Sequence, residues 1–211
     1  MATPDPISPE GAVLAAPELA LLLQAGSVAL MPTDTLPALV ASPEHAGQIW
    51  ALKHRPAHKP LILMGAGLEQ FEAVLGTPWR REWLELADQG WPGALTLVLP
   101  ARGPWVHRLH PGGLDLGLRI PACQQARELL SHSGPLATTS ANPSGQPAAT
   151  SVEQARELFP ALPVLGPLPW PAAGGQASTV LAWQGADHGE AGRWRLLRAG
   201  AFLPADLQLD S

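Results

Sequence analysis

A chain of 211 residues with 46% hydrophobic content can bury a full core, so one globular domain with small additions at most is expected. A formal charge of -5 and a charged-residue content of only 15% exclude a protein that grips nucleic acid by a broad basic surface. The single cysteine, Cys123, excludes an internal disulfide and a cysteine-based zinc site, as suits a reducing compartment.

The two ends and the longest apolar run predict a cytoplasmic protein with no membrane contact. Residues 1–12 contain prolines and two acids but no basic residue, so we expect a flexible leader and not a signal peptide. The run from Leu19 to Met31 is interrupted by polar residues and is too short to span a bilayer. We expect one domain over residues 13–205 and a tail at 206–211.

Apolar spacing predicts alternating helices and strands in the first half of the chain. The first strand is expected to end in the polar loop Pro32–Thr35, and the second helix to end before a loop that holds both lysines. The expected helices are 17–24, 44–52, 68–75 and 79–89, and the expected strands are 27–31, 61–64 and 94–99.

The second half continues the alternation. Its expected strands are 114–120, 135–138, 178–183 and 193–197, with helices from Pro121 to about residue 130 and from a Thr150 or Ser151 cap to residue 158. A Pro/Gly-rich connection covers 163–175. These patterns predict an α/β fold, in one domain, with a twisted mixed sheet and flanking helices around a concave groove.

Rare residue types mark two short polar segments. The only two lysines, Lys53 and Lys59, lie on either side of Arg55, and the only asparagine, Asn142, lies in the stretch from Thr138 to Gly145. Lysine supplies a compact charge and arginine a planar fork, while hydroxyls and backbone amides can cradle phosphate oxygens. We therefore expect an anion site built from separate loops.

Several common site types have no support in the sequence. There is no P-loop and no dinucleotide-binding glycine fingerprint. No nucleophile stands beside an evident base, and the histidine pairs His54/His58 and His107/His110 lack a third ligand, so no protein-bound metal is expected. With these site types excluded, we expect the polar residues of the loops to bind and position an anion.

Seven motifs occur in the order typical of one family, and together they cover the chain from about Gly26 to Ala201. They are Pro32-Thr-Asp-Thr35, Lys53-x-Arg55-Pro56 with Lys59-Pro60-Leu61, Trp91-Pro-Gly-Ala-Leu-Thr96, Leu118-Arg119-Ile-Pro121, Thr138-Thr-Ser-Ala-Asn-Pro-Ser-Gly145, Ser178-Thr-Val180 and Leu197-Arg198-x-Gly200. In these motifs the chain resembles the short, single-domain branch of the YrdC-like threonylcarbamoyl-AMP synthases.

The resemblance implies an L-threonylcarbamoyladenylate synthase, a nucleotidyltransferase. Such an enzyme makes threonylcarbamoyl-AMP and pyrophosphate from L-threonine, bicarbonate and ATP, with Mg²⁺ accompanying ATP. The product serves the N6-threonylcarbamoyladenosine modification of tRNA. The resemblance also implies two kinds of candidate binding partner. They are tRNA or double-stranded RNA, and partner proteins of tRNA modification.

Carried onto this sequence, the family pattern assigns roles to ten residues. As catalytic residues that hold the ATP phosphates it implies Lys53 and Arg55. For the rest of the ATP site it implies Ser140, Asn142, Ser178 and Arg198. As the border of the threonine site it implies Thr35, Lys59, Arg119 and Thr138.

One departure keeps two other functions open. Relatives usually continue the first loop with an aromatic residue and Gly-Leu-Gly, whereas here Thr35 is followed by Leu36-Pro37-Ala38-Leu39. A paralogue that acts on another carbamoyl acceptor is therefore an alternative. The other is a non-catalytic module of the same fold that binds RNA in tRNA or ribosome maturation.

Overall fold

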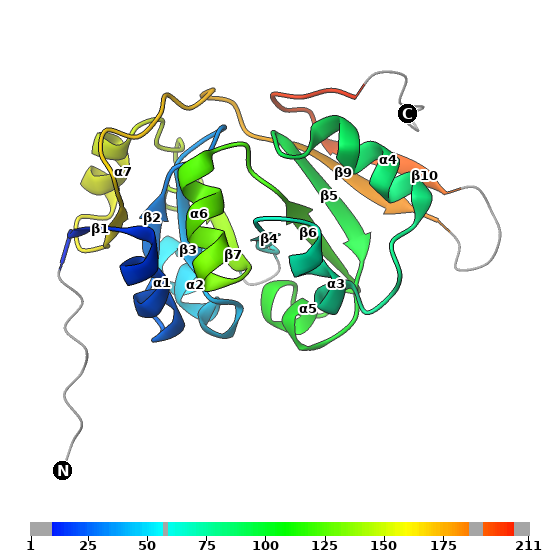
Figure 1. Ribbon diagram of the computed structural model, residues 1–211, viewed down its shortest axis with the longest axis horizontal. Coiled ribbons are helices and arrows are strands. Elements are labelled where there is room, and N and C mark those ends of the chain that lie inside the picture. Colours follow the sequence, from blue (N-terminus) through cyan, green and yellow to red (C-terminus); the bar gives the residue numbers. More distant parts are fainter. Residues whose placement is uncertain (1–9, 57–58, 186–191, 205–211) are drawn as a thin grey trace, which may run out of the picture.

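A computed structural model describes residues 10–56, 59–185 and 192–204, which form one mixed sheet with helices packed against it (Figure 1). Its strands are β1 (Val13–Leu14), β2 (Ala29–Met31), β3 (Ala38–Ala41), β4 (Ile62–Met64), β5 (Leu95–Pro100), β6 (Asp115–Arg119), β7 (Leu136–Ser140), β8 (Val164–Leu165), β9 (Thr179–Gln184) and β10 (Arg193–Arg198). The helices are α1 (Ala16–Gln24), α2 (Gly47–Lys53), α3 (Glu69–Leu75), α4 (Arg81–Gly90), α5 (Pro104–Leu109), α6 (Gln124–Ser133) and α7 (Val152–Leu158), with a 3₁₀ turn at Pro43–His45.

The order of strands across the sheet is β1-β8-β2-β3-β7-β4-β6-β5-β9-β10. Because β8 lies near one edge and β9 near the other, the segment 166–178 crosses almost the whole width of the sheet, along the top in Figure 1. Two of its amides hold it to the first polar loop: Gly174 N donates to Asp34 O and Gly175 N to Thr35 O, each at 3.0 Å.

Side chains of the central strands alternate between two hydrophobic cores, as strand geometry requires. Met31 and Val40 pack into one core with α1 and α6, whereas Leu30 and Leu39 pack into the other with residues of α2 and α7. All four are fully buried. Burial on both faces fixes the strand register, and so fixes which residues end at the polar edge.

The predicted fold class is confirmed, and most predicted elements are present with ends shifted by one to three residues. Three local predictions are wrong. Lys53 is the last residue of α2 and not part of the following loop, and α6 begins at Gln124 and not at Pro121. The strand expected at 135–138 runs to Ser140, so Thr138 and Ser140 lie on β7 itself. Four short elements, β1, β3, α5 and β8, were not predicted.

The ends of the chain are described only in part. Gly11 N donates to Ala161 O at 3.3 Å, so the packed region begins within the leader expected at 1–12. Residues 1–9 and the expected tail at 206–211 lie outside the described part. Among the described helices, none has the length and apolar character needed to cross a membrane.

Gly200 lets the chain after β10 return closely against the start of β9. A Cβ at this position would lie 2.3 Å from both Ala177 O and the carbonyl carbon of Ser178. Gly200 N also donates to Thr179 Oγ1 at 3.0 Å, and Ala201 N to Ala177 O at 2.9 Å. The close approach therefore fixes the backbone at Ser178.

Gly200→Ala should lower the free energy of unfolding by roughly 1–3 kcal/mol, because the new methyl group overpacks against backbone. Gly47→Ala is the matched control, since a Cβ there meets nothing within 4 Å and alanine favours a helix. Urea unfolding measures both. Equal stability of the two variants would contradict the close approach at Gly200.

A candidate anion-binding site

A cavity of about 200 Å³ lies where the ends of β2, β4, β6 and β7 meet the starts of β3 and β9. Its polar side chains are three arginines and six hydroxyls, and no carboxylate is among its lining residues in the described part of the chain. The lining consists of Thr33, Thr35, Leu36, Ala38, Arg55, Pro60, Ile62, Met64, Arg119, Thr138, Thr139, Ser140, Ala177, Ser178 and Arg198. A cavity with this charge is suited to an anion.

Arg119, the last residue of β6, is 3% exposed and held on three sides. Its guanidinium donates to Gly93 O at 3.0 Å, to Thr35 Oγ1 at 2.8 Å and to Asp34 Oδ1 at 2.8 Å. Burial lowers the pKa of Arg119, and the Asp34 charge opposes that shift. A guanidinium has five N–H donors, so two remain for a ligand.

Asp34 is committed to this arrangement. Besides the ion pair with Arg119, its Oδ1 accepts a hydrogen bond from Ala122 N at 3.0 Å. The carboxylate therefore positions the Arg119 side chain at the end of β6.

Arg198 is held by the start of β9. Its Nε donates to Ser178 O at 3.0 Å, and one terminal nitrogen donates to Ser178 Oγ at 3.1 Å. Ser178 Oγ in turn lies 2.9 Å from Thr96 Oγ1, which is fully buried on β5. This chain of contacts fixes a second arginine beside the first.

Arg55 is the third arginine that lines the cavity. Its Nε donates to Lys59 O at 3.2 Å and a terminal nitrogen to Pro60 O at 2.8 Å. Both acceptors belong to the segment that leads into β4. The Arg55 side chain is therefore held by the backbone four and five residues further along the chain. The remaining donors of its guanidinium are available to a ligand.

Lys53 lies behind the cavity wall and is 1% exposed. Its ammonium donates to Ser140 O and Asn142 O, each at 2.5 Å, and to Asn142 Oδ1 at 3.1 Å. An ammonium has three N–H donors, so these acceptors saturate it. In this structure Lys53 holds the shape of the loop after β7, and Ser144 N donates back to Lys53 O at 2.9 Å.

Asn142 has no spare polar group either. Its Nδ2 donates to Gln146 O at 2.6 Å and to Pro143 O at 3.0 Å, while its Oδ1 also accepts from Ser140 Oγ at 2.6 Å. The buried Thr138 Oγ1, in contrast, has no hydrogen-bond partner among the described residues although it lines the cavity. A ligand group would satisfy it.

The structure brings seven of the ten predicted site residues to the cavity wall: Thr35, Arg55, Arg119, Thr138, Ser140, Ser178 and Arg198. Lys53 and Asn142 stand directly behind the wall, and Lys59 is exposed on the adjoining loop outside the lining. Sequence reasoning missed the lining residues Thr139, Ile62 and Met64, and the supporting Thr96. Of these, Thr139 and Thr96 had a signal, because each lies within one of the seven motifs.

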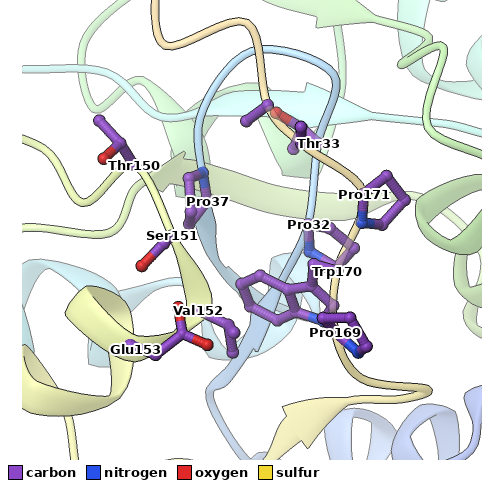
Figure 2. Close-up of a pocket in the computed structure, with 12 residues that line it drawn as sticks. Pro32, Thr33, Pro37, Thr150, Ser151, Val152, Glu153, Pro169, Trp170 and Pro171 are labelled. Carbon is purple, nitrogen blue, oxygen red and sulfur yellow. The ribbon is translucent and has the colours of Figure 1, made fainter.

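The structure also shows where the departure after Thr35 and the buried Trp170 lie. The departure after Thr35 reaches the cavity, because Leu36 and Ala38 line it. Trp170 is 9% exposed and its Nε1 donates to Leu165 O at 2.6 Å, so it packs into the fold. It lines a separate hollow of about 100 Å³ behind the first polar loop, opposite Ser151 and Glu153 (Figure 2).

The fold and the cavity together define an α/β protein with a pre-arranged anion site of hydroxyls and arginines. Residues 21–200 match the model of the Sua5/YciO/YrdC family, whose description is "Telomere recombination", and the chain belongs to this family. The family predicted from the motifs is thus confirmed.

Several relatives are named threonylcarbamoyl-AMP synthase. The protein of that name from Stutzerimonas stutzeri is 34% identical over 149 residues, which are 68% of this chain and 78% of that protein. The one from Halorhodospira halophila is 39% identical over 145 residues, 65% of this chain and 73% of that protein.

Solved structures agree on the fold. Sua5 of Pyrococcus abyssi, in a complex with L-threonine, is similar with a TM-score of 0.78 and 30% identity, covering 88% of this chain and 54% of that one. YciO of Escherichia coli is similar with a TM-score of 0.72, covering 88% of each chain. At 20% identity, the second likeness shows the fold alone.

Lys53→Ala and Arg55→Ala should differ in stability. Loss of the Lys53 ammonium removes the buried donor shared by Ser140 O, Asn142 O and Asn142 Oδ1, so we expect the free energy of unfolding to fall by roughly 1–3 kcal/mol. Arg55→Ala removes a side chain from the cavity wall and should leave stability almost unchanged. Urea unfolding separates the two, with exposed Lys59→Ala as control; equal losses for Lys53 and Lys59 would contradict the anchoring role.

Anion affinity should depend on the charge of Lys53. Burial, and to a smaller degree the charge of Arg55, lowers the pKa of Lys53 from 10.5 to about 8. Above that pH the amine loses its charge and one donor, so the loop after β7 loosens. We expect ATP affinity, measured by calorimetry, to fall as pH rises from about 7 to about 9. Lys53→Met should bind more weakly and show no such decline in this range.

Proposed function

We propose that this protein is an L-threonylcarbamoyladenylate synthase, a nucleotidyltransferase that works in the cytoplasm. The observation that carries the proposal is the cavity lined by Arg55, Arg119 and Arg198, with no acid among the described residues of its lining, in a chain related to proteins of that name. The substrates would be L-threonine, bicarbonate and ATP. The product would serve tRNA modification, where tRNA and the partner proteins are proposed contacts.

The proposed reaction needs charge and positioning more than a covalent catalyst. Threonine and bicarbonate first give the carbamate and water. A carbamate oxygen then attacks the α-phosphorus of ATP, forming a new P–O bond, while the α–β bridging P–O bond breaks and pyrophosphate leaves with its electron pair. No side chain has to act as nucleophile or base in this step.

The residues that line the cavity suggest where each substrate would bind. Arg55 and Arg198 line the cavity together with Ser140 and Ser178, and these two arginines would take the phosphates and the negative charge that grows on pyrophosphate. Lys53 and Asn142 lie behind the lining and would support it by holding the loop after β7 in place. Arg119 would take the threonine carboxylate with its two free donors.

The remaining assignments border the same threonine. Thr35 and the unpartnered Thr138 would face it, with Lys59 on the loop outside.

Magnesium would enter with ATP as part of the substrate. No carboxylate lines the cavity among the described residues, and Asp34 is already bonded to Arg119 and Ala122 N. The described residues also hold no group of three or more metal-ligating side chains. The phosphates and water would therefore supply its ligands.

A paralogue with another carbamoyl acceptor is the second candidate, and one observation favours it. Leu36 and Ala38 line the cavity at the positions where the family pattern has an aromatic residue and a leucine. This change alters the apolar surface beside the acceptor and leaves the arginines in place. The RNA-binding module has no comparable support, since the chain carries a net charge of -5.

One assay tests these candidates together: incorporation of labelled bicarbonate, with pyrophosphate release, in the presence of ATP and a panel of amino acids. Threonine-dependent turnover supports the synthase, and turnover with a different amino acid supports the paralogue. No turnover with any of them, combined with salt-sensitive RNA binding, would leave the RNA module.

Arg119→Lys should raise KM for threonine more than KM for ATP. Lysine keeps a positive charge but loses the fork that meets a carboxylate, at a cost of roughly 1.5–3 kcal/mol, or about 10- to 100-fold. Steady-state kinetics with each substrate varied in turn measures this. Equal increases for both substrates would count against the placement of Arg119 beside threonine.

A further inference from the structure

A second polar hollow, of about 210 Å³, lies at the opposite end of β5 from the cavity described above. Thr96 supports the first site at the start of β5, whereas Arg102 lines the second hollow just beyond the end of that strand. At about 3.3 Å per residue, the intervening strand separates the two regions by roughly 15–20 Å. The hollow contains none of the residues assigned to catalysis.

Hydrogen-bond donors dominate this hollow. Its lining includes two arginines, Arg80 and Arg102, two tryptophans, Trp83 and Trp183, and Thr77. No acid belongs to this lining, and neither arginine forms an ion pair with a carboxylate in the described part of the chain. In a chain of net negative charge, such a concentration of unpaired cations requires an explanation.

The arginine from the start of α4 is held by aromatic rings. Its Cζ lies 5.7 Å from the centroid of the Trp83 ring and 5.8 Å from that of Trp183, and the two rings meet edge to face at 6.0 Å. Contacts of this kind orient a guanidinium without using its N–H groups. Arg80 therefore keeps its donors for another partner.

A buried donor points to the same conclusion. Trp83 is 1% exposed, and its Nε1 has no hydrogen-bond acceptor among the described residues. A buried N–H without a partner costs about 1–3 kcal/mol, so native structures usually supply an acceptor. Because Trp83 lines the hollow, an oxyanion there would lie beside this indole, and it would neutralise the two arginines.

We propose that the hollow lined by Arg80, Trp83 and Arg102 binds a phosphate group. Planar guanidinium forks match the spacing of phosphate oxygens, and two forks from different elements can grip the group from two sides. The phosphate comes either from a free ion, such as phosphate or pyrophosphate, or from the backbone of RNA. One acid, Glu72, lines the adjoining hollow and limits how much negative charge the site accepts.

The indole N–H signal of Trp83 in a ¹⁵N NMR spectrum is the direct readout. Phosphate, pyrophosphate and a short single-stranded RNA are titrated separately into the full chain at constant ionic strength, with chloride as the reference anion. We expect a saturable shift of the Trp83 signal. A shift with the free ions identifies them as the source, and a shift with RNA alone identifies its backbone.

Matched variants decide the assignment. Arg102→Met should weaken the interaction at least tenfold, whereas Arg81→Met should bind like the unaltered chain, because Arg81 is exposed and pairs with Glu85 at 2.6 Å outside the hollow. If Arg102→Met does not fold, Arg80→Lys and Arg102→Lys, which keep the charge but lose the fork, should each weaken binding severalfold.

Three results would overturn the proposal. They are a Trp83 signal that no phosphate compound shifts, a shift that chloride reproduces, and a shift that persists unchanged in the folded arginine variants.

Discussion

The site depends on one buried cation surrounded by oxygen atoms. The Lys53 ammonium meets the Ser140 and Asn142 carbonyls and the Asn142 amide oxygen, so the end of α2 is joined to the loop after β7. These acceptors come from neighbouring residues, and a compact charge with three N–H donors can bond to all of them at once. Arg55 lies two residues further along the chain. The contacts of Lys53 therefore also help to position the backbone from which the Arg55 side chain reaches the cavity.

The arginines of the cavity are positioned by protein contacts before any ligand arrives. Asp34 and Thr35 hold Arg119, Ser178 holds Arg198, and backbone carbonyls of its own loop hold Arg55. Such preorganisation reduces the ordering cost of binding and leaves donors directed at the place where charge develops. The segment 166–178, bonded to the first polar loop through Gly174 and Gly175, contributes to the same rigidity.

The sequence predicts the class of fold and most of the cavity wall, because those features depend on local patterns. Apolar runs identify strands such as β5, and rare polar residues identify the segments around Lys53 and Asn142. The sequence does not reveal that Lys53 faces inward, since the orientation of a side chain at a helix end depends on the loop packed against it. The motif around Thr96 marks that segment but does not reveal its supporting role, because its contact with Ser178 spans 82 positions.

The arrangement of strands also has a consequence for biosynthesis. The cavity takes residues from Thr33 near one end of the chain to Arg198 near the other, and β9, which carries Ser178 at its start, pairs with β5 far upstream. The chain must therefore be synthesised through Arg198 before the site can assemble. Until then β5 lacks β9 as its neighbour, and pairings that are so distant along the chain form slowly. Newly made copies would depend on chaperones for longer than a protein built from local hairpins.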